Sequence, residues 1–227
     1  MSAVASQRGR GGGAVKHPLF ARFLEWRNRA PQADEVALRR ELVAGLSGRV
    51  LEIGPGNGLN FAHYPLDVGL LVGVEPEPYL RSRAIEAARR APVPTVVIGG
   101  LAGELPFADS SFDAAVVSGV LCSVPDVQGA LADLARVLRP EAELRFYEHV
   151  RAASPLRGRF QDLADLLWPR LMGGCHPNRE TAAAIERAGY GRLSFREFMF
   201  PPGSRLCPVG PRILGRARVP PRSTSSG

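Results

Sequence analysis

The sequence is poor in cysteine and has no long apolar run. Three cysteines, Cys122, Cys175 and Cys207, are spread over 227 residues without a Cys-x-x-Cys pair. That spacing argues against a disulfide framework and a structural zinc site, and it favours a reducing cytoplasm. The longest charge-free apolar stretch covers only 12 residues, 114–125. It is too short to span a bilayer as a helix, and we expect neither a secretory signal nor a membrane anchor.

Lysine is nearly absent, and acids are missing from both ends of the chain. Residues 1–16 hold three basic side chains and 205–227 hold five, with no acid in either segment. The body between them carries 21 basic and 22 acidic side chains, although the whole chain has a net charge of +7. A neutral body lacks the basic stripe typical of nucleic-acid enzymes. The basic ends are expected to be solvated tails, or to make weak peripheral contact with an anionic membrane surface.

The middle of the chain alternates strands with helices. Residues 1–16 and 220–227 are expected to be disordered ends around a single domain at 17–219. Strands are predicted at 50–53, 68–74, 94–98, 112–120, 144–147, 193–200 and 209–219, and helices at 17–28, 34–46, 78–90, 127–138, 156–171 and 179–188. Apolar strands separated by helices predict a parallel α/β sheet that is covered on both faces. Pro211 favours a sheet edge for the last strand.

A glycine-rich turn follows the first strand of the alternating region. The turn reads Leu51-Glu52-Ile53-Gly54-Pro55-Gly56-Asn57-Gly58. Its three glycines leave no side chain between backbone and ligand and allow a tight turn, although a simple turn would need them too. Ligands of open α/β sheets bind at this edge. Leu59 stands where a dinucleotide fingerprint requires glycine, which argues against a nicotinamide or flavin cofactor.

Glu75 ends the second strand, 21 residues beyond Gly54. An acid at this place is suited to accept hydrogen bonds from ribose hydroxyls. The alternative is an acid that faces the N-terminal dipole of the next helix. With the glycine-rich turn, the first interpretation predicts a cofactor that contains a nucleoside.

These motifs, taken together, resemble a known family. They are Glu52-x-Gly54-x-Gly56-x-Gly58, Glu75, Leu105-Pro106-Phe107 with Phe112-Asp113, and Arg136-Val137-Leu138-Arg139-Pro140. The set resembles class I S-adenosylmethionine-dependent methyltransferases, especially the ubiquinone/menaquinone-type branch, methyltransferase type 11. This resemblance implies a Rossmann-like fold with a seven-stranded, mostly parallel sheet and helices on both faces. It also implies S-adenosyl-L-methionine as the cofactor.

A second set of motifs is similar to the alkyl thiol methyltransferase-like group. It comprises Val120-Leu121-Cys122-Ser123-Val124, Glu148-His149-Val150, Gly174-Cys175, Arg179-Glu180-Thr181 and Pro208-Val209-Gly210-Pro211. The similarity implies methyl transfer to a small, fairly apolar acceptor, with a thiol as the first choice. The alternatives are a quinone or phenol C- or O-methyltransferase and a non-catalytic cofactor-binding protein. The animal members carry an N-terminal membrane-anchoring segment that is not evident here, so we expect a cytoplasmic protein, at most peripheral at the membrane surface, without an obligate protein partner.

The resemblance also assigns cofactor contacts. Glu52 and the backbone of Gly54 and Gly56 are expected at the methionine part, and Ser118 would offer its carbonyl to the methionine amino group. Glu75 would hold the ribose diol. The other expected cofactor residues are Pro55, Asn57, Gly58, Pro76 beside the adenosine, and Leu101 and Ala102 beside the adenine. Many relatives have an acid at the adenine, whereas the nearest acid here is Glu104.

Fewer sequence features identify the binding site of the methyl acceptor. Methyl transfer from a sulfonium is an in-line displacement, so the enzyme mainly aligns the reactants and excludes water. His149 is the candidate catalytic base because its pKa lies near neutral, unless local hydrogen bonds already satisfy it. The weaker candidates are His63, Tyr64 and Tyr147. Cys122 reads as a small buried hydrophobe, and Cys175-His176 lacks further ligands at metal spacing, so no metal site is predicted.

Residues 151–177 form a lid-like insert in this interpretation. The insert follows the fifth strand and therefore starts at the ligand-binding edge, and Gly173-Gly174 offers a hinge. Its apolar side chains, together with those of the first helix, would roof the acceptor pocket, although such stripes also occur as ordinary core. They are Leu163, Leu166, Leu167, Trp168, Leu171 and Met172, with Phe20, Phe23 and Trp26 of the first helix.

Overall fold

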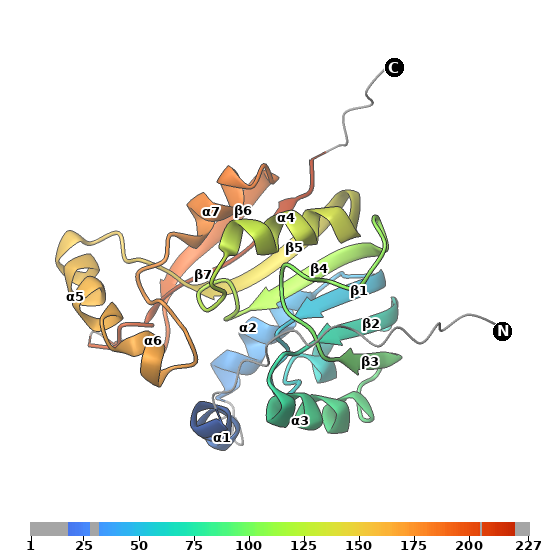
Figure 1. The fold of residues 1–227 in the computed structure, drawn as a ribbon, viewed down its shortest axis with the longest axis horizontal. Helices are drawn as coiled ribbons and strands as arrows, with labels where there is room; N and C mark the ends of the chain where they lie inside the picture. Colours follow the sequence, from blue (N-terminus) through green and yellow to red (C-terminus); the bar gives the residue numbers. More distant parts are fainter. Residues whose placement is uncertain (1–17, 28–31, 205, 221–227) are drawn as a thin grey trace.

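A computed structural model of the protein describes residues 18–27, 32–204 and 206–220. The tail predicted at 1–16 lies outside these ranges, as does the end predicted at 220–227 apart from Pro220. The described part forms a central sheet with helices packed on two sides (Figure 1). None of its helices is long and apolar enough to cross a membrane.

The sheet of the described chain has seven strands in the order β3-β2-β1-β4-β5-β7-β6. The strands are β1 (Gly48–Ile53), β2 (Val68–Val74), β3 (Thr95–Ile98), β4 (Phe112–Ser118), β5 (Leu138–His149), β6 (Gly191–Met199) and β7 (Pro211–Arg218). The first five pair in parallel, and β7 pairs antiparallel with both β5 and β6. The sequence prediction of a seven-stranded, mostly parallel sheet is confirmed.

Two of the helices, α3 and α4, begin at a side chain that accepts from an N–H group of the first turn. The helical segments are α1 (Pro18–Arg27), α2 (Ala33–Val43), η1 (Phe61–His63), α3 (Pro78–Ala88), α4 (Val127–Val137), α5 (Pro155–Asp165), α6 (Trp168–Leu171) and α7 (Thr181–Arg187). Glu77 caps α3 by accepting from the N–H of Leu80, and Pro78 pre-sets the first turn. Asp126 caps α4 through the N–H of Gly129.

Two apolar cores lie on the two faces of the sheet. One packs α4 and α7 against the strands, with Leu131, Leu134 and Ile185 fully buried. The other packs α2, α3 and η1 against the opposite face, around Leu42 and Phe61. The strands are therefore covered on both sides, which explains their continuous apolar sequences.

Three predicted elements differ in the structure. β5 begins at Leu138 rather than 144: Leu138 and Ala142 are buried, the three residues between them are exposed, and Glu143 forms ion pairs with Arg145 and Arg218. β7 lies inside the sheet rather than at its edge: Pro211 is its first residue, where a missing N–H is tolerated. The helix predicted at 156–171 is two helices, since Pro169 cannot continue the first one.

Candidate cofactor and acceptor site

The three glycines of the turn after β1 have different structural roles. All three have positive φ, between 60° and 81°. A Cβ on Gly54 would lie 2.6 Å from Cγ2 of Val120, and one on Gly58 would lie 2.7 Å from Cβ of Ala87. A side chain at either position would clash with another part of the protein, so these two glycines are needed for internal packing. A Cβ on Gly56 would meet only Leu24, at 4.0 Å, so Gly56 is the glycine that leaves open space for a ligand.

Glu75 holds two loops together with its carboxylate. Oε2 accepts from the N–H of Gly56 at 2.9 Å, and Oε1 accepts from the N–H of Glu77 at 3.0 Å. The side chain is buried, and burial raises its pKa to about 7, while the two backbone donors act in the opposite direction. A carboxylate oxygen can accept more than one hydrogen bond. Glu75 thus has the place and the remaining capacity to accept from a vicinal diol.

The helix-dipole alternative for Glu75 describes only one of its two oxygens: Oε1 accepts from the N–H of Glu77, the residue before α3, whereas Oε2 faces the glycine-rich turn. Glu77, not Glu75, supplies the oxygen that caps α3. Arg81 donates to the backbone carbonyls of Glu75 and Pro76, at 2.9 and 3.2 Å, and so fixes the segment after β2. The backbone that carries Glu75 is therefore held in place, with one carboxylate oxygen directed at the glycine-rich turn.

The remaining predicted cofactor residues follow the ends of β1, β2, β3 and β4. Those of the turn after β1 are Pro55, which is buried, and Asn57, which is partly exposed. Pro76, Leu101, Ala102 and Ser118 are partly buried, and Glu104 is exposed. Because the strands are parallel, their carboxyl ends meet at one edge of the sheet, on the side of α1 and α6 (Figure 1). The structure gathers the predicted cofactor residues along this edge.

Glu52 sits in a buried polar network. Its oxygens accept from Nδ2 of Asn60 at 2.7 Å and from the hydroxyl of Tyr64 at 2.8 Å. Burial raises the pKa of Glu52 to about 7. Burial and the neighbouring carboxylate raise the pKa of Tyr64 well above its ordinary value. Tyr64 is therefore a hydrogen-bond donor that supports the turn rather than a base.

The surroundings of the two other weak base candidates, Tyr147 and His63, do not favour a role as a base. Tyr147 stacks on Phe198 with a 5° interplanar angle, accepts from Arg212 at its hydroxyl, and has its pKa raised by burial. His63 belongs to η1, on the α2 and α3 side of the sheet. Tyr147 lies opposite Ser118, the last residue of β4, but its raised pKa makes it a poor base, and His63 lies on neither β4 nor β5.

Glu148 organises the loop after β4, a role that sequence reasoning missed. Its carboxylate accepts from the backbone N–H groups of Val120, Leu121 and Cys122, at 2.8, 3.1 and 3.3 Å. Burial raises its pKa to about 7, against the effect of the three donors. Val120 also fills the space above Gly54. The glycine-rich turn, the loop after β4 and the end of β5 therefore form one packed unit.

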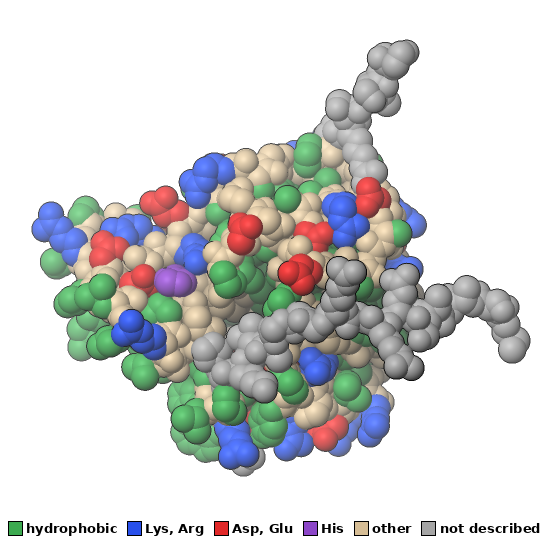
Figure 2. All heavy atoms as spheres, viewed as in Figure 1, with side chains coloured by type: hydrophobic (Ala, Val, Ile, Leu, Met, Phe, Trp, Pro, Cys, Tyr) green, Lys and Arg blue, Asp and Glu red, His purple; other side chains and the backbone are tan. Residues whose placement is uncertain are grey.

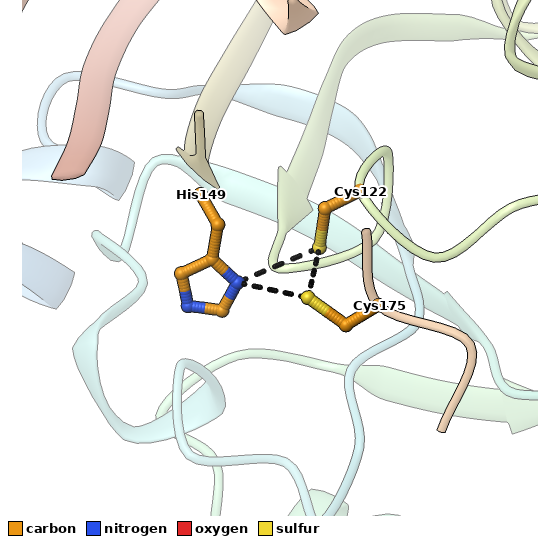
Figure 3. Close-up of side chains that lie close together, drawn as sticks. All are labelled: Cys122, His149 and Cys175. Atoms are coloured by element: carbon orange, nitrogen blue, oxygen red, sulfur yellow. Dashed lines mark hydrogen bonds between the residues drawn. The ribbon is translucent and has the colours of Figure 1, made fainter. Parts of the chain in front are cut away.

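His149 ends β5 beside two cysteines. Its Nδ1 lies 3.6 Å from Sγ of Cys122 and 3.4 Å from Sγ of Cys175, and the two sulfurs are 3.5 Å apart (Figure 3). Both thiols are buried, and His149 is partly so. We call these three residues the Cys-His-Cys cluster. They come from the end of β5, the loop after β4 and the insert, 26 and 27 residues apart, so no short motif reveals them.

The three groups of the cluster shift one another's ionisation. Burial lowers the pKa of His149, which keeps the ring neutral at pH 7. The two thiols share a hydrogen bond, and this contact lowers the pKa of Cys175. The same bond, together with burial, raises the pKa of Cys122 well above its ordinary value. The shared bond thus favours ionisation of Cys175 over that of Cys122.

The insert is tied to the body at its base. Nε2 of the buried Gln161 contacts the carbonyls of Val150, Pro177 and Pro208, at 3.0, 2.8 and 2.9 Å. The N–H of His176 donates to the carbonyl of Cys122 at 2.8 Å, which brings the end of the insert onto the loop after β4. Sequence reasoning missed Gln161, because an isolated glutamine between two apolar segments carries no periodic signal.

The leucines of the insert face outward. Leu163 and Leu166 are each 68% exposed, so ordinary core is the wrong interpretation for them. Leu167 and Leu171 are similarly exposed. A Cβ on Gly173 would lie 2.6 Å from the ring of Phe20, so α1 and the insert touch at the predicted hinge. Phe23 and Trp26, which were expected to roof the pocket, are largely exposed.

Known proteins match the segment from β1 to β5 and, at greater length, about three quarters of the chain. A family model described as "Methyltransferase domain" matches residues 51–146, from β1 to β5. Thiol S-methyltransferase TMT1B of Mus musculus is 35% identical over 179 residues, which cover 76% of this chain and 72% of the mouse protein. Thiol S-methyltransferase TMT1A of Homo sapiens is 33% identical over 180 residues, covering 77% and 72%. Both alignments extend well beyond the span that the family model matches.

A solved structure shows the same fold. A SAM-dependent methyltransferase from Thermotoga maritima superposes with a TM-score of 0.64 at 23% identity. The superposition covers 88% of this chain and 98% of the other. Likeness at this identity supports the arrangement of the sheet and helices.

Proposed function

The chain belongs to the S-adenosylmethionine-dependent methyltransferases, in the family of the thiol S-methyltransferases, and from this premise we propose that it methylates the sulfur of a small apolar thiol. The relatives' activity supports the thiol, because their alignment spans about three quarters of the chain. The acceptor would lie at the Cys-His-Cys cluster, at the carboxyl ends of β4 and β5.

The structure fits S-adenosyl-L-methionine at the edge described above. We propose that Glu75 binds the ribose diol, with Gly56 beside it as the open face of the turn. Ser118 would meet the methionine amino group, and Leu101 and Ala102 would border the adenine. Glu75 carries this assignment, since it is a buried carboxylate at the glycine-rich turn with acceptor capacity left.

The reaction requires no covalent bond between the protein and either substrate. The acceptor sulfur attacks the sulfonium methyl group, a new carbon–sulfur bond forms, and the old one breaks with its electron pair going to the leaving sulfur. A thiol with a pKa of about 8.5 is only a few per cent ionised at pH 7. We propose that His149 promotes loss of the thiol proton, and that the chain otherwise aligns the three atoms and excludes water.

A turnover assay tests the proposed function. The purified protein is incubated with methyl-labelled cofactor and, separately, a small alkyl thiol, a phenol, a quinone and an amine, and products are identified by mass spectrometry. We expect labelled thioether from the thiol. A rate–pH profile in wild type and His149→Ala then measures the role of His149. Turnover of phenols, quinones or amines without any thiol product would overturn the thiol assignment and leave the methyltransferase in place.

We further propose a weak peripheral membrane contact through the insert. Leu163, Leu166 and Leu167 are exposed on α5 and the turn after it, near the exposed Arg159 and Arg170. Figure 2 shows hydrophobic, basic and acidic side chains intermixed at the end of the molecule that α5 and α6 form in Figure 1. Exposed leucines beside basic side chains suit the interface of an anionic bilayer.

Co-sedimentation with vesicles of phosphatidylcholine and phosphatidylserine tests this contact. The double variant Leu166→Ser/Leu167→Ser should lose binding several-fold. Leu206→Ser is the matched control, because Leu206 is 85% exposed outside the insert. Equal binding by both variants would remove the insert from the contact.

A further inference from the structure

The Cys-His-Cys cluster has the dimensions of a metal site. Tetrahedral zinc has Zn–S bonds of about 2.3 Å and Zn–N bonds of about 2.0–2.1 Å. Those lengths place two sulfur ligands about 3.8 Å apart and a sulfur and a nitrogen about 3.6 Å apart. The corresponding distances here are 3.5 Å between the sulfurs, and 3.6 and 3.4 Å from the sulfurs to Nδ1. The three ligand atoms thus nearly form one face of a zinc tetrahedron.

The ligand types point to the same class of metal. Two thiols and one imidazole suit zinc and other soft or borderline ions, whereas magnesium and calcium require oxygen ligands. The three ligand atoms point toward one another in Figure 3 and lie within 4.8 Å of one another. Two thiolates would neutralise a divalent zinc ion, which lets the ion sit in a largely buried place beside Arg212.

The backbone holds each ligand before any metal binds. Cys122 is fixed by its N–H on Glu148 and by its carbonyl, which accepts from His176. His149 pairs with Arg212 in the sheet register. The N–H of Cys175 donates to the carbonyl of Met172 at 3.1 Å. A site whose ligands come from three fixed segments requires little rearrangement on binding.

Three protein ligands are the number found in catalytic zinc sites. Structural sites close the tetrahedron with four protein ligands, while catalytic sites leave one position for water or substrate. Within the described residues, the group of candidate ligands at this place has three members, Cys122, His149 and Cys175. The fourth position would therefore be open, at the carboxyl ends of β4 and β5, where the acceptor is proposed to lie.

We propose that Cys122, His149 and Cys175 bind a zinc ion whose open position takes the acceptor thiol as a thiolate. This inference rests on the proposed function for its substrate, and it states how His149 promotes loss of the thiol proton. Zinc lowers the pKa of a bound thiol, and thiolate is the form that attacks. His149 then acts as a ligand through Nδ1 rather than as a base.

The step balances without a further reactant. The thiol displaces water from zinc and releases its proton to solvent. The zinc-bound thiolate sulfur forms a bond to the sulfonium methyl carbon, and the bond from that carbon to the cofactor sulfur breaks, its electron pair staying on the leaving sulfur. Thiolate and sulfonium charges cancel, so the products are a neutral thioether and neutral-sulfur S-adenosylhomocysteine. A thioether is a weak ligand, so the product leaves the metal.

Metal analysis of the purified protein, prepared without a histidine tag, tests the site directly. We expect close to one zinc per chain, and loss of most of it in Cys122→Ser, Cys175→Ser and His149→Ala. Cys207→Ser is the matched control, because Cys207 is the third cysteine and lies outside the cluster. Circular dichroism of each variant checks folding. Chelator treatment of wild type supplies metal-free protein in case a variant does not fold.

Cobalt substitution tests the open position. Cobalt-loaded wild type should show a sulfur-to-cobalt charge-transfer band, which Cys207→Ser retains and Cys175→Ser loses. Adding a small alkyl thiol should change the visible spectrum, while an alcohol of the same size should not. Metal-free wild type should lose at least tenfold in thiol turnover, and zinc should restore it.

The outcomes separate this inference from the proposed function. Thiol methylation at full rate by metal-free protein would overturn the zinc site and leave the thiol methyltransferase standing. Protein without metal whose Cys122 and Cys175 form a disulfide would overturn it as well. Stoichiometric zinc in a protein that methylates no thiol would instead refute the proposed function, and with it the zinc-bound acceptor.

Discussion

Replacing Glu75 tests the cofactor site most sharply. Its two oxygens bridge the N–H groups of Gly56 and Glu77, and the ribose diol would add two O–H donors to the same carboxylate. Hydrogen bonds to a charged group contribute about 1.5–3 kcal/mol. Glu75→Ala should therefore weaken S-adenosylmethionine binding by roughly tenfold to 150-fold. Isothermal titration calorimetry on the folded variant measures this change.

Two companion variants separate binding from folding. Glu75→Gln keeps the shape, but its amide offers only one acceptor oxygen where the structure needs two, so it should lose affinity and stability together. Glu77→Ala removes the cap of α3 at the same junction. We expect it to cost about 1 kcal/mol of stability and to leave the affinity unchanged. A folded Glu75→Ala protein with wild-type affinity would remove Glu75 from the cofactor site.

The raised pKa of Glu75 adds a pH signature to the same assay. Without cofactor the carboxyl has a pKa of about 7, and the diol binds its ionised form. Lowering the pH through 7 therefore protonates the binding form, and the affinity should fall by about tenfold per pH unit below that value. Above it, the affinity should be flat. Glu75→Gln should remove this slope, and a slope that persists in Glu75→Gln would assign the titration to another group.

Four further predictions concern the turn, the loop after β4, pH and the N-terminal tail. Gly56→Val should abolish cofactor binding in calorimetry, whereas Gly45→Val, at another open glycine of positive φ, should leave it intact. Glu148→Ala should destabilise the protein by about 3 kcal/mol in urea unfolding, because three backbone N–H groups lose a buried acceptor. The folded state holds protons on buried carboxyls such as Glu52 up to a pKa of about 7, above the unfolded value, so stability of the cofactor-free protein should fall as pH rises from about 4.5 to 7 in thermal melts. Deleting residues 1–16 should leave turnover and Tm nearly unchanged, and a large loss of either would show that the tail takes part.

The sequence supports a prediction for the cofactor side because the signals there are local. Gly54, Gly56 and Gly58 follow an apolar strand directly, and Glu75 ends the next strand along the chain. In a parallel sheet the carboxyl ends of these two strands lie at the same edge, so residues that follow each strand in the sequence lie close together in the fold. Even so, the sequence could not tell that Gly54 and Gly58 serve packing while Gly56 leaves the open space.

The acceptor side could not be predicted in the same way. Cys122, His149 and Cys175 are separated by more than 25 residues each, and each one alone resembles a buried or locally satisfied side chain. Metal-binding patterns read from sequence depend on short spacings, which explains why no site was predicted. Glu148 and Gln161 were hidden for a similar reason: a buried polar residue is informative only when its partners are known.

The sequence by itself determined the strand–helix alternation and the edge at which its predicted nucleoside-binding residues lie, because apolar periodicity and turn chemistry act over a few neighbouring residues. Only the tertiary structure decided that β7 lies inside the sheet, that the leucines of the insert face outward, and that two thiols meet one imidazole. These features depend on antiparallel pairing and on an insert folding back onto the loop after β4. Contacts of that kind join residues far apart in the chain, and their free energy depends on the whole packed fold rather than on any local pattern.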